Sequence, residues 1–307
     1  MFCTKETLRE TLERDGVAVI PGVLDDCDAM VSGMWDYLEH VSQKWEKPIK
    51  REDETTWREF YKLYPKHSML LQHYDVGHAQ SSWDVRQNPK IVEIFQYFWG
   101  RDDLLVSFDG FSFHLPPEVT NKGWFRKSWY HSDQSFTKPD FQCVQSFVTG
   151  FDIEEGDATL SVFKGSHVYH ADFRDTFGIT DKSDWTKLTA EQQTFYEKCE
   201  IVDIVCPKGS LVLWDSRTIH CGMEAKKTRT NPKIRAITYL CYMPRDITPA
   251  QLKKKQNAFH DRRTTNHYPC QIKLFPVKPH TYGGTETICE PIKEPVLTDI
   301  GRQLAGF

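Results

Sequence analysis

The chain has 307 residues, 39% of them hydrophobic and 27% charged, so we expect a soluble globular protein with a sizeable core. The net charge of −4 argues against a nucleic-acid partner, and the absence of any long apolar run argues against a membrane span or a secretory signal. Nine cysteines, an odd number without a C-x-x-C pair, indicate free thiols in a reducing compartment, which we expect to be the cytoplasm.

The first 100 residues predict helices around one short strand. Leu8 and Leu12 have helical spacing, with Thr4 expected as the N-cap and Gly16 as the end of this helix. The helices are expected at 5–14, 25–41 and 88–100, and the strand at 17–24.

From residue 101 to 245 the sequence becomes rich in short strands separated by Pro and Gly turns, which predicts a β-sandwich or barrel. The expected strands are LLVSFDGFSFHL, CVQSFVTGFDI, ATLSVF, EIVDIVC, SLVLWD and IRAITYLCYM. One helix, 188–199, interrupts them and opens with a capping box from Thr189 to Gln192.

The final segment, 246–307, predicts one helix followed by irregular chain. Thr248 is the expected N-cap, Pro249 occupies the first turn, and Gln251 completes a capping box. The last 45 residues are rich in Pro and Thr and are expected to wrap the core. We expect residues 1–307 to form a single domain, mainly β with flanking helices; the sequence leaves the oligomeric state open.

Two His-x-Asp patterns are candidate metal sites, His131-Ser-Asp133 and His170-Ala-Asp172. With 12 histidines, about one such pattern is expected by chance. On a strand, however, residues two apart share a face, as required of two ligands from one segment. Two histidines and one carboxylate are the facial set of non-haem Fe(II) sites, which leaves positions open for a co-substrate and O2.

The third ligand must come from a distant strand, and His220 is the best candidate, at the end of KGSLVLWDSRTIHCG. A dicarboxylate co-substrate also needs a fixed cation, for which arginine offers a planar bidentate fork. Arg235 opens the strand IRAITYLCYMP and is the preferred candidate. Its rival, Arg229, lies in the polar turn KKTRTNP, where a solvated arginine is the default expectation.

Several segments, in this order, resemble the phytanoyl-CoA dioxygenase-like branch of the Fe(II)/2-oxoglutarate oxygenases. They are ERDGVAVIPGVL, FSFHLPP, YHSDQSF, EEGDATLSVFKGSH, KGSLVLWDSRTIHCG and IRAITYLCYMP. The resemblance covers residues from about 8 to 245. Two departures are visible: Asp157-Ala158 stands where the family usually has Asn-Gly, and Lys164 where it has Pro.

The resemblance implies a double-stranded β-helix, a distorted jelly roll, with His131, Asp133 and His220 as the metal ligands. Fe(II) is the implied metal, and 2-oxoglutarate and O2 are the implied co-substrates. Arg235 is implied to bind the far carboxylate of 2-oxoglutarate. His170 and Asp172 follow a turn where the family has no ligand, and His167 in that turn is expected to make a structural hydrogen bond.

Alignment to the family further implies a 2-oxoglutarate pocket lined by Phe111, Gln145 and Phe147, although ordinary core positions would look the same. Trp129, Tyr130 and Gln134 flank the metal segment and are candidates for facing substrate, with simple packing as the alternative.

Because Asp133 keeps the carboxylate that halogenating relatives lose, hydroxylation of a C–H bond with release of succinate and CO2 is the favoured reaction. We expect a small polar or amphipathic substrate. The alternatives are an oxygenase acting on a protein or nucleic acid and a non-enzymatic binder on a degenerate oxygenase fold. Residues 171–187 form a polar insertion expected to act as a lid, with Phe173, Arg174 and Trp185 approaching substrate.

Overall fold

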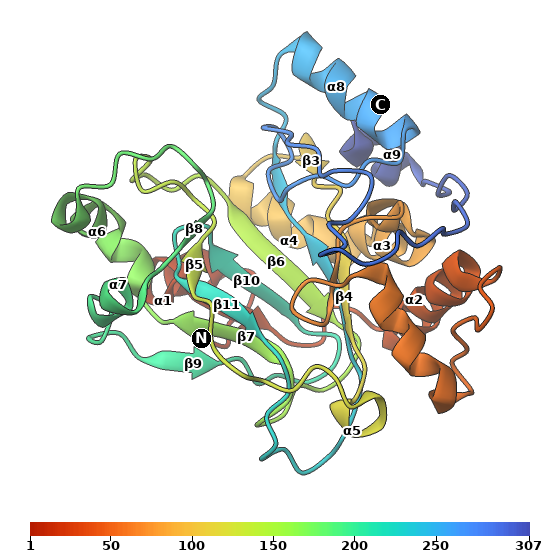
Figure 1. Ribbon diagram of the computed structural model, residues 1–307. Helices are drawn as coiled ribbons and strands as arrows, with labels where there is room; N and C mark the ends of the chain where they lie inside the picture. Colours follow the sequence, from red (N-terminus) through yellow and green to blue (C-terminus); the bar gives the residue numbers. More distant parts are fainter.

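A computed structural model describes all 307 residues, and its two main antiparallel sheets face each other (Figure 1). The larger sheet has the order β1-β10-β6-β12-β4-β2 and the smaller β8-β5-β11-β7-β9, while β13 pairs with β3. The larger sheet contains β1 (Val17–Ile20), β2 (Leu70–Leu71), β4 (Phe111–His114), β6 (Val144–Thr149), β10 (Leu211–Asp215) and β12 (Arg235–Leu240). The smaller contains β5 (His131–Ser132), β7 (Thr159–Phe163), β8 (Thr186–Lys187), β9 (Ile201–Asp203) and β11 (His220–Met223). The separate pair is β3 (Leu104–Val106) and β13 (Tyr242–Pro244).

Helices cover the outer face of the larger sheet and one end of the smaller one. Figure 1 shows α2, α3, α4, α8 and α9 grouped on one side of the strands, with α6 and α7 at the opposite end. The α-helices are α1 (Leu8–Asp15), α2 (Cys27–Ser42), α3 (Gln80–Arg86), α4 (Pro89–Trp99), α5 (Pro117–Thr120), α6 (His170–Phe177), α7 (Ala190–Thr194), α8 (Pro249–His260) and α9 (Asp299–Ala305). Three 3-10 helices are η1 (Glu54–Leu63), η2 (Val76–His78) and η3 (Ser166–Tyr169).

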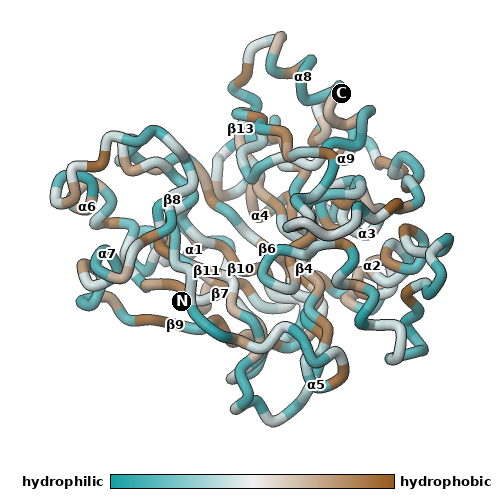
Figure 2. Tube along the Cα trace, viewed as in Figure 1, coloured by the Kyte–Doolittle hydropathy of each residue, from teal (hydrophilic) through white to brown (hydrophobic).

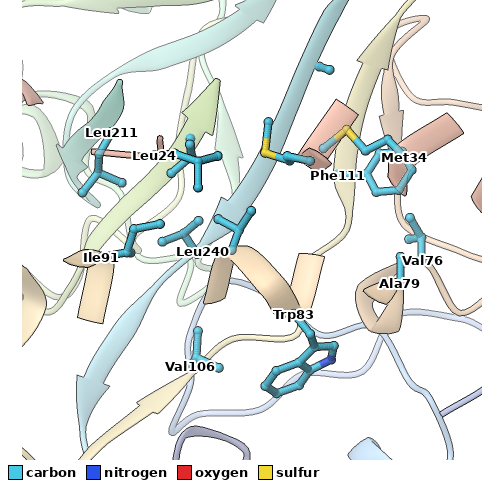
Figure 3. Close-up of a cluster of buried hydrophobic side chains, with 14 of the residues drawn as sticks. Leu24, Met34, Val76, Ala79, Trp83, Ile91, Val106, Phe111, Leu211 and Leu240 are labelled. Carbon is cyan, nitrogen blue, oxygen red and sulfur yellow. The ribbon is translucent and has the colours of Figure 1, made fainter. Parts of the chain in front are cut away.

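Strand alternation divides the apolar side chains of the larger sheet between two cores. In β1, Ala18 and Ile20 join the core beneath the helices, whereas Val17 and Val19 join a second core between the sheets. Figure 3 shows the first core, where Leu211 and Leu240 of the sheet lie near Ile91 of α4. Burial on both faces explains why these strands are nearly continuously apolar.

The distribution of hydropathy follows this layering (Figure 2). Hydrophilic residues dominate the exposed parts of α8 and the outer loops, and hydrophobic residues concentrate on the central strands and α4. The core beneath the helices includes residues from Leu8 to Ala305. No helix combines the length and apolar character that crossing a membrane would require.

The expected strands after residue 100 are all present, and several helix boundaries are confirmed. Gly16 ends α1 in the left-handed region, at φ 71°, and both expected capping boxes are formed. Two boundaries were wrong. The first helix begins at Leu8, with Thr7 at the N-cap position in place of Thr4. The helix expected at 188–199 is α-helical only over Ala190–Thr194.

Strand β5 is attached to the smaller sheet through very few residues. It pairs with β11 only through His131 and His220, and with β8 through His131–Lys187 and Ser132–Thr186. The strand that begins at His131 therefore lies between an inner neighbour, β11, and a two-residue edge strand, β8.

Candidate metal centre

Direct pairing of β5 with β11 brings the two candidate histidine ligands together. Because His131 and His220 are register partners, their side chains leave the sheet on the same face, toward the larger sheet. Asp133 follows two residues after His131. Its Oδ1 lies 3.4 Å from His131 Nε2, and its Oδ2 lies 3.4 Å from His220 Nε2. One ligand atom from each residue lies within 4.8 Å of the other two, close enough to hold one metal ion.

Each imidazole is oriented by a backbone carbonyl. His220 Nδ1 lies 2.8 Å from the Thr218 carbonyl oxygen, and His131 Nδ1 lies 3.4 Å from that of Trp129. An Nδ1–H that donates to a carbonyl leaves the lone pair of Nε2 free, as metal coordination requires. Both histidines thus direct Nε2, the nitrogen that would coordinate a metal, at the carboxylate.

The electrostatics of the three side chains also suit a cation. Burial lowers the pKa of His131, which keeps its imidazole neutral. For Asp133, burial alone would raise the pKa, but the two imidazoles outweigh this and hold it well below its usual range. The amide of Gln145 supports the same carboxylate, since its Nε2 donates to Asp133 Oδ2 at 3.1 Å. The site therefore combines two imidazoles with one ionised carboxylate, the donor set of an Fe(II) facial site.

Arg235 lies on β12, on the face that is directed between the sheets. It is 5% exposed, its Nη1 donates to Ser112 Oγ at 2.7 Å, and its Nε has no partner. No carboxylate of the chain forms an ion pair with it. Burial lowers the pKa of this guanidinium, opposed by Tyr239. A buried cation without an anion is costly, so the site fits a carboxylate from a ligand such as 2-oxoglutarate.

Gly222 leaves open space beside His220. It lies two residues further along β11, on the same face, and a Cβ there would come within 3.4 Å of Met69 Cε and 3.6 Å of Trp129 Cζ2. Met69 Sδ in turn lies 3.5 Å from Arg235 Nη1. Met69 therefore links the surroundings of the triad to those of Arg235, as an extended co-substrate reaching both would require.

Comparison with known proteins identifies the family. The family model described as phytanoyl-CoA dioxygenase matches residues 12–230, well over half of the chain. The chain belongs to the phytanoyl-CoA dioxygenase family. This membership supports an oxygenase-type enzyme that uses iron and 2-oxoglutarate.

Individual proteins are similar to the chain in sequence or in fold. A curated protein of Aspergillus versicolor, "Ava biosynthesis cluster protein O", is 27% identical over 274 residues and covers 85% of both chains. A hypothetical protein of Escherichia coli has a similar fold, with a TM-score of 0.62, 13% identity and coverage of 99% of this chain and 81% of that one. SnoK, a non-heme alpha-ketoglutarate-dependent carbocyclase from nogalamycin biosynthesis, matches with a TM-score of 0.51, 16% identity and coverage of 79% and 84%.

The structure shows the role of Asp157, which is one of the chain's departures from the family pattern. Asp157 is buried and forms ion pairs with Arg229, at 3.4 Å, and Lys233, at 3.2 Å. Arg229 is therefore not the solvated residue that the sequence suggested. Its side chain is 2% exposed, and its Nε donates to Glu118 Oε1 at 2.9 Å. Because Arg229 already has two carboxylate partners, Arg235 remains the free cation.

Phe111 was expected in the 2-oxoglutarate pocket, and this expectation was wrong. Strand pairing places Ser112 opposite Ile237 and His114 opposite Arg235, so alternation directs Phe111 to the other face. There it packs edge-on against Tyr37 in the helical core. The missed residue is its neighbour Ser112, whose hydroxyl contacts Arg235.

Phe147 and Gln145 do lie on the face shared with Arg235. The Arg235 guanidinium lies 5.7 Å from the centre of the Phe147 ring, and Gln145 contacts Asp133 as described above. Trp214, opposite Gln145 in the β10–β6 pair, was also missed; its ring lies 5.3 Å from that of His220.

The structure separates the expected substrate residues into two groups. Trp129 and Trp185 lie beside the triad, with ring centres 4.7 Å and 5.8 Å from that of His131. The expectation that Gln134 faces substrate was wrong, because its side chain is buried. Its amide nitrogen donates to the carbonyls of Lys138 and Asp140, and its amide oxygen accepts from Ser216. It fixes the loop after the metal segment.

The expectation for Phe173 was wrong as well, whereas that for Arg174 stays a prediction. Phe173 is completely buried in α6, where its ring stacks on Phe136 and Tyr196. Arg174 lies on the surface of the same helix and pairs with its neighbour Asp175. Core packing therefore removes Phe173 from the expected lid.

The histidines of the turn and of the second His-x-Asp pattern have structural hydrogen bonds, as predicted for His167. His167 Nε2 lies 3.1 Å from the Glu13 carbonyl, and His170 Nε2 lies 3.0 Å from that of Ser135. Tyr130 also packs on the outer face of its sheet, with its hydroxyl 2.8 Å from Ser161 Oγ.

Proposed function

We propose that this protein is an Fe(II)/2-oxoglutarate-dependent dioxygenase that hydroxylates a C–H bond of a small polar or amphipathic molecule. One observation carries the proposal: a His-Asp-His set with convergent ligand atoms and a buried arginine without an anion, Arg235, face the same space between two sheets. We further propose that the two facing sheets are those of a double-stranded β-helix.

The chain's own residues would prepare the reaction. His131, Asp133 and His220 would hold the metal, and Gln145 would keep the carboxylate of Asp133 in place. Arg235 and Ser112 would bind the far carboxylate of 2-oxoglutarate. When bound, Fe(II) with 2-oxoglutarate and O2 supplies the oxidation of the C–H bond, with release of succinate and CO2.

The carboxylate of Asp133 supports hydroxylation over halogenation, because a halide would need the position that this carboxylate fills. Membership of the family supports the oxidative class, but the name of SnoK shows that a relative in fold is described as a carbocyclase. A mass gain of 16 Da in the product would support hydroxylation, whereas a loss of 2 Da would indicate ring closure or desaturation.

The proposal is tested by loading the protein anaerobically with Fe(II) and 2-oxoglutarate, adding small molecules, admitting O2 and measuring succinate and product mass. Succinate release with a product 16 Da heavier is the expected result. Failure to bind Fe(II) would instead support a non-enzymatic binder. Turnover only with a protein or nucleic acid would support the macromolecular alternative.

The nine cysteines form no disulfide. This supports a reducing compartment, and we propose the cytoplasm.

A further inference from the structure

A stack of three rings leads away from the candidate metal ligand His131. The rings of His131 and Trp129 are nearly parallel, at 4.7 Å and 6°, and His67 lies on Trp129 at 3.7 Å and 5°. His67 belongs to the tight turn before β2, and it adopts a positive φ of 48°. A non-glycine residue in this region is unusual, so the turn holds His67 against Trp129 at some conformational cost.

Trp185 adds a second aromatic surface near His131. Its ring is tilted by 39° to that of His131 at 5.8 Å, and the residue is 52% exposed. Apart from His131, no aromatic ring of the chain lies against Trp185, and about half of its surface stays open for contact. A planar molecule approaching the triad would find Trp185 available for contact.

Two lysines without carboxylate partners accompany these rings. Lys187 is the register partner of His131 across β5 and β8, so its side chain leaves the sheet on the face that bears the ligands. Lys66 precedes His67 in the turn, and its Nζ lies 5.6 Å from the ring of Phe275. Neither lysine forms an ion pair, in contrast to Lys138, which pairs with Asp184.

Chain connectivity and strand register place both lysines beside the stack, because Lys66 precedes His67 and Lys187 is the register partner of His131. Burial of its ring lowers the pKa of His67 to about 4, and the side chains of His131, Lys66 and Lys187 lower it further. His67 is therefore neutral at physiological pH, and the two lysines supply the positive charge here. We call Lys66, His67, Trp129, Trp185 and Lys187 the cationic aromatic cluster.

We propose that the cationic aromatic cluster selects the substrate, and that this substrate is a small planar ring compound carrying an anionic group. The ring would lie against Trp185, and the anionic group would lie near Lys66 and Lys187, which leaves a carbon of the ring or its substituent toward the triad. The inference rests on the proposed function, since it concerns the substrate of that same centre.

The test uses enzyme loaded anaerobically with Fe(II) and saturating 2-oxoglutarate, titrated by calorimetry with three probes. These are 2-naphthoate, its neutral amide 2-naphthamide, and the aliphatic anion octanoate. We expect 2-naphthoate to bind more tightly than the other two. Equal binding of the amide would overturn the anionic requirement, and equal binding of octanoate would overturn the planar one.

Variants assign the preference to particular residues. Lys66→Gln and Lys187→Gln should each weaken 2-naphthoate binding about two- to fivefold, the range for exposed charge pairs, and leave 2-naphthamide unchanged. Trp185→Leu should weaken both naphthyl probes. Lys253→Gln is the matched control, because Lys253 is exposed on α8 and is likewise unpaired. Lysine variants that bind 2-naphthoate like the wild type would overturn the assignment.

The two proposals can fail separately. If Fe(II) and 2-oxoglutarate bind but 2-naphthoate shows no preference, only the substrate inference is overturned. If neither Fe(II) nor 2-oxoglutarate binds, the proposed function is overturned, whatever the probes do.

Discussion

At the scale of single residues, the two His-x-Asp patterns and a distal histidine supplied the candidates, and the family resemblance selected the three side chains that the structure brings together. His131 and Asp133 belong to one short motif, and His220 follows a predicted apolar strand. Phe111 was misplaced because the face that a strand residue occupies depends on the parity of its register, and a shift of one residue reverses it. The signal that could have corrected this is Ser112, a small polar residue between two phenylalanines.

Removal of one proposed ligand should abolish metal uptake. His131→Ala leaves one imidazole and one carboxylate, and we expect Fe(II) affinity to fall by more than about 100-fold, beyond the effect of outer-shell changes. Metal content after equilibrium dialysis measures this. His170→Ala is the control, because His170 belongs to the second His-x-Asp pattern but hydrogen-bonds to the Ser135 carbonyl and stacks on Phe136. Retained affinity in His131→Ala would place the metal elsewhere.

The buried arginines Arg229 and Arg235 should differ in the anions that they bind. Arg235→Lys should raise the 2-oxoglutarate concentration needed for half-saturation about 10- to 100-fold, because an ammonium cannot replace two parallel hydrogen bonds to a carboxylate. Arg229→Lys should leave that value unchanged and lower thermal stability, since it disrupts the pairs with Glu118 and Asp157. Succinate-release kinetics and thermal melts separate the two effects; the reverse pattern would assign the co-substrate to Arg229.

At the scale of elements, capping chemistry and alternation predicted most strands and the starts of α7 and α8. Four α-helices were missed, α3, α5, α6 and α9. Each is short, of four to eight residues, and α3 contains two serines and α6 a threonine, so local propensity alone is weak. Tertiary packing decides such segments, as the burial of Phe173 shows for α6.

The expected lid is therefore divided into two parts with different predicted behaviour. Helix α6 should keep constant hydrogen-exchange protection, because Phe173 anchors it. Residues 178–187, which carry Trp185, should gain protection when 2-oxoglutarate and 2-naphthoate are added to the Fe(II) enzyme. Hydrogen exchange followed by mass spectrometry resolves both peptides. Equal behaviour of the two peptides would rule out a lid confined to 178–187.

At the scale of the whole molecule, four buried histidines share one arrangement. His78, His114, His167 and His170 each direct Nε2 at a backbone carbonyl, and each has a buried Nδ1 without a partner. Burial lowers the pKa of His78 to about 3 and those of His114 and His170 to about 4, and it also lowers the pKa of His167. Protonation of Nδ1 would place an unpaired charge in the core, so folding opposes protonation of all four.

This arrangement predicts acid sensitivity. Below pH 6.5 the unfolded chain binds protons at these histidines and the folded protein does not, so stability falls with pH until about pH 4. Each histidine contributes up to about 1.4 kcal/mol of lost stability per pH unit. Urea unfolding at pH 7, 6 and 5 measures the loss. His170→Gln should reduce its steepness, whereas His260→Gln, at an exposed position, should not.

The single residue pair between β5 and β11 has a consequence for the order of assembly. The pair consists of the two imidazoles that would share the metal, so ion binding would crosslink a junction that backbone pairing secures at only one position. Strand β8, with Lys187 and the adjacent Trp185, is attached to the fold through β5. Metal binding would then come first and would fix Trp185 and Lys187 in place for the organic substrate. We therefore expect proteases to cut the metal-free protein within 178–187 sooner than the metal-loaded protein.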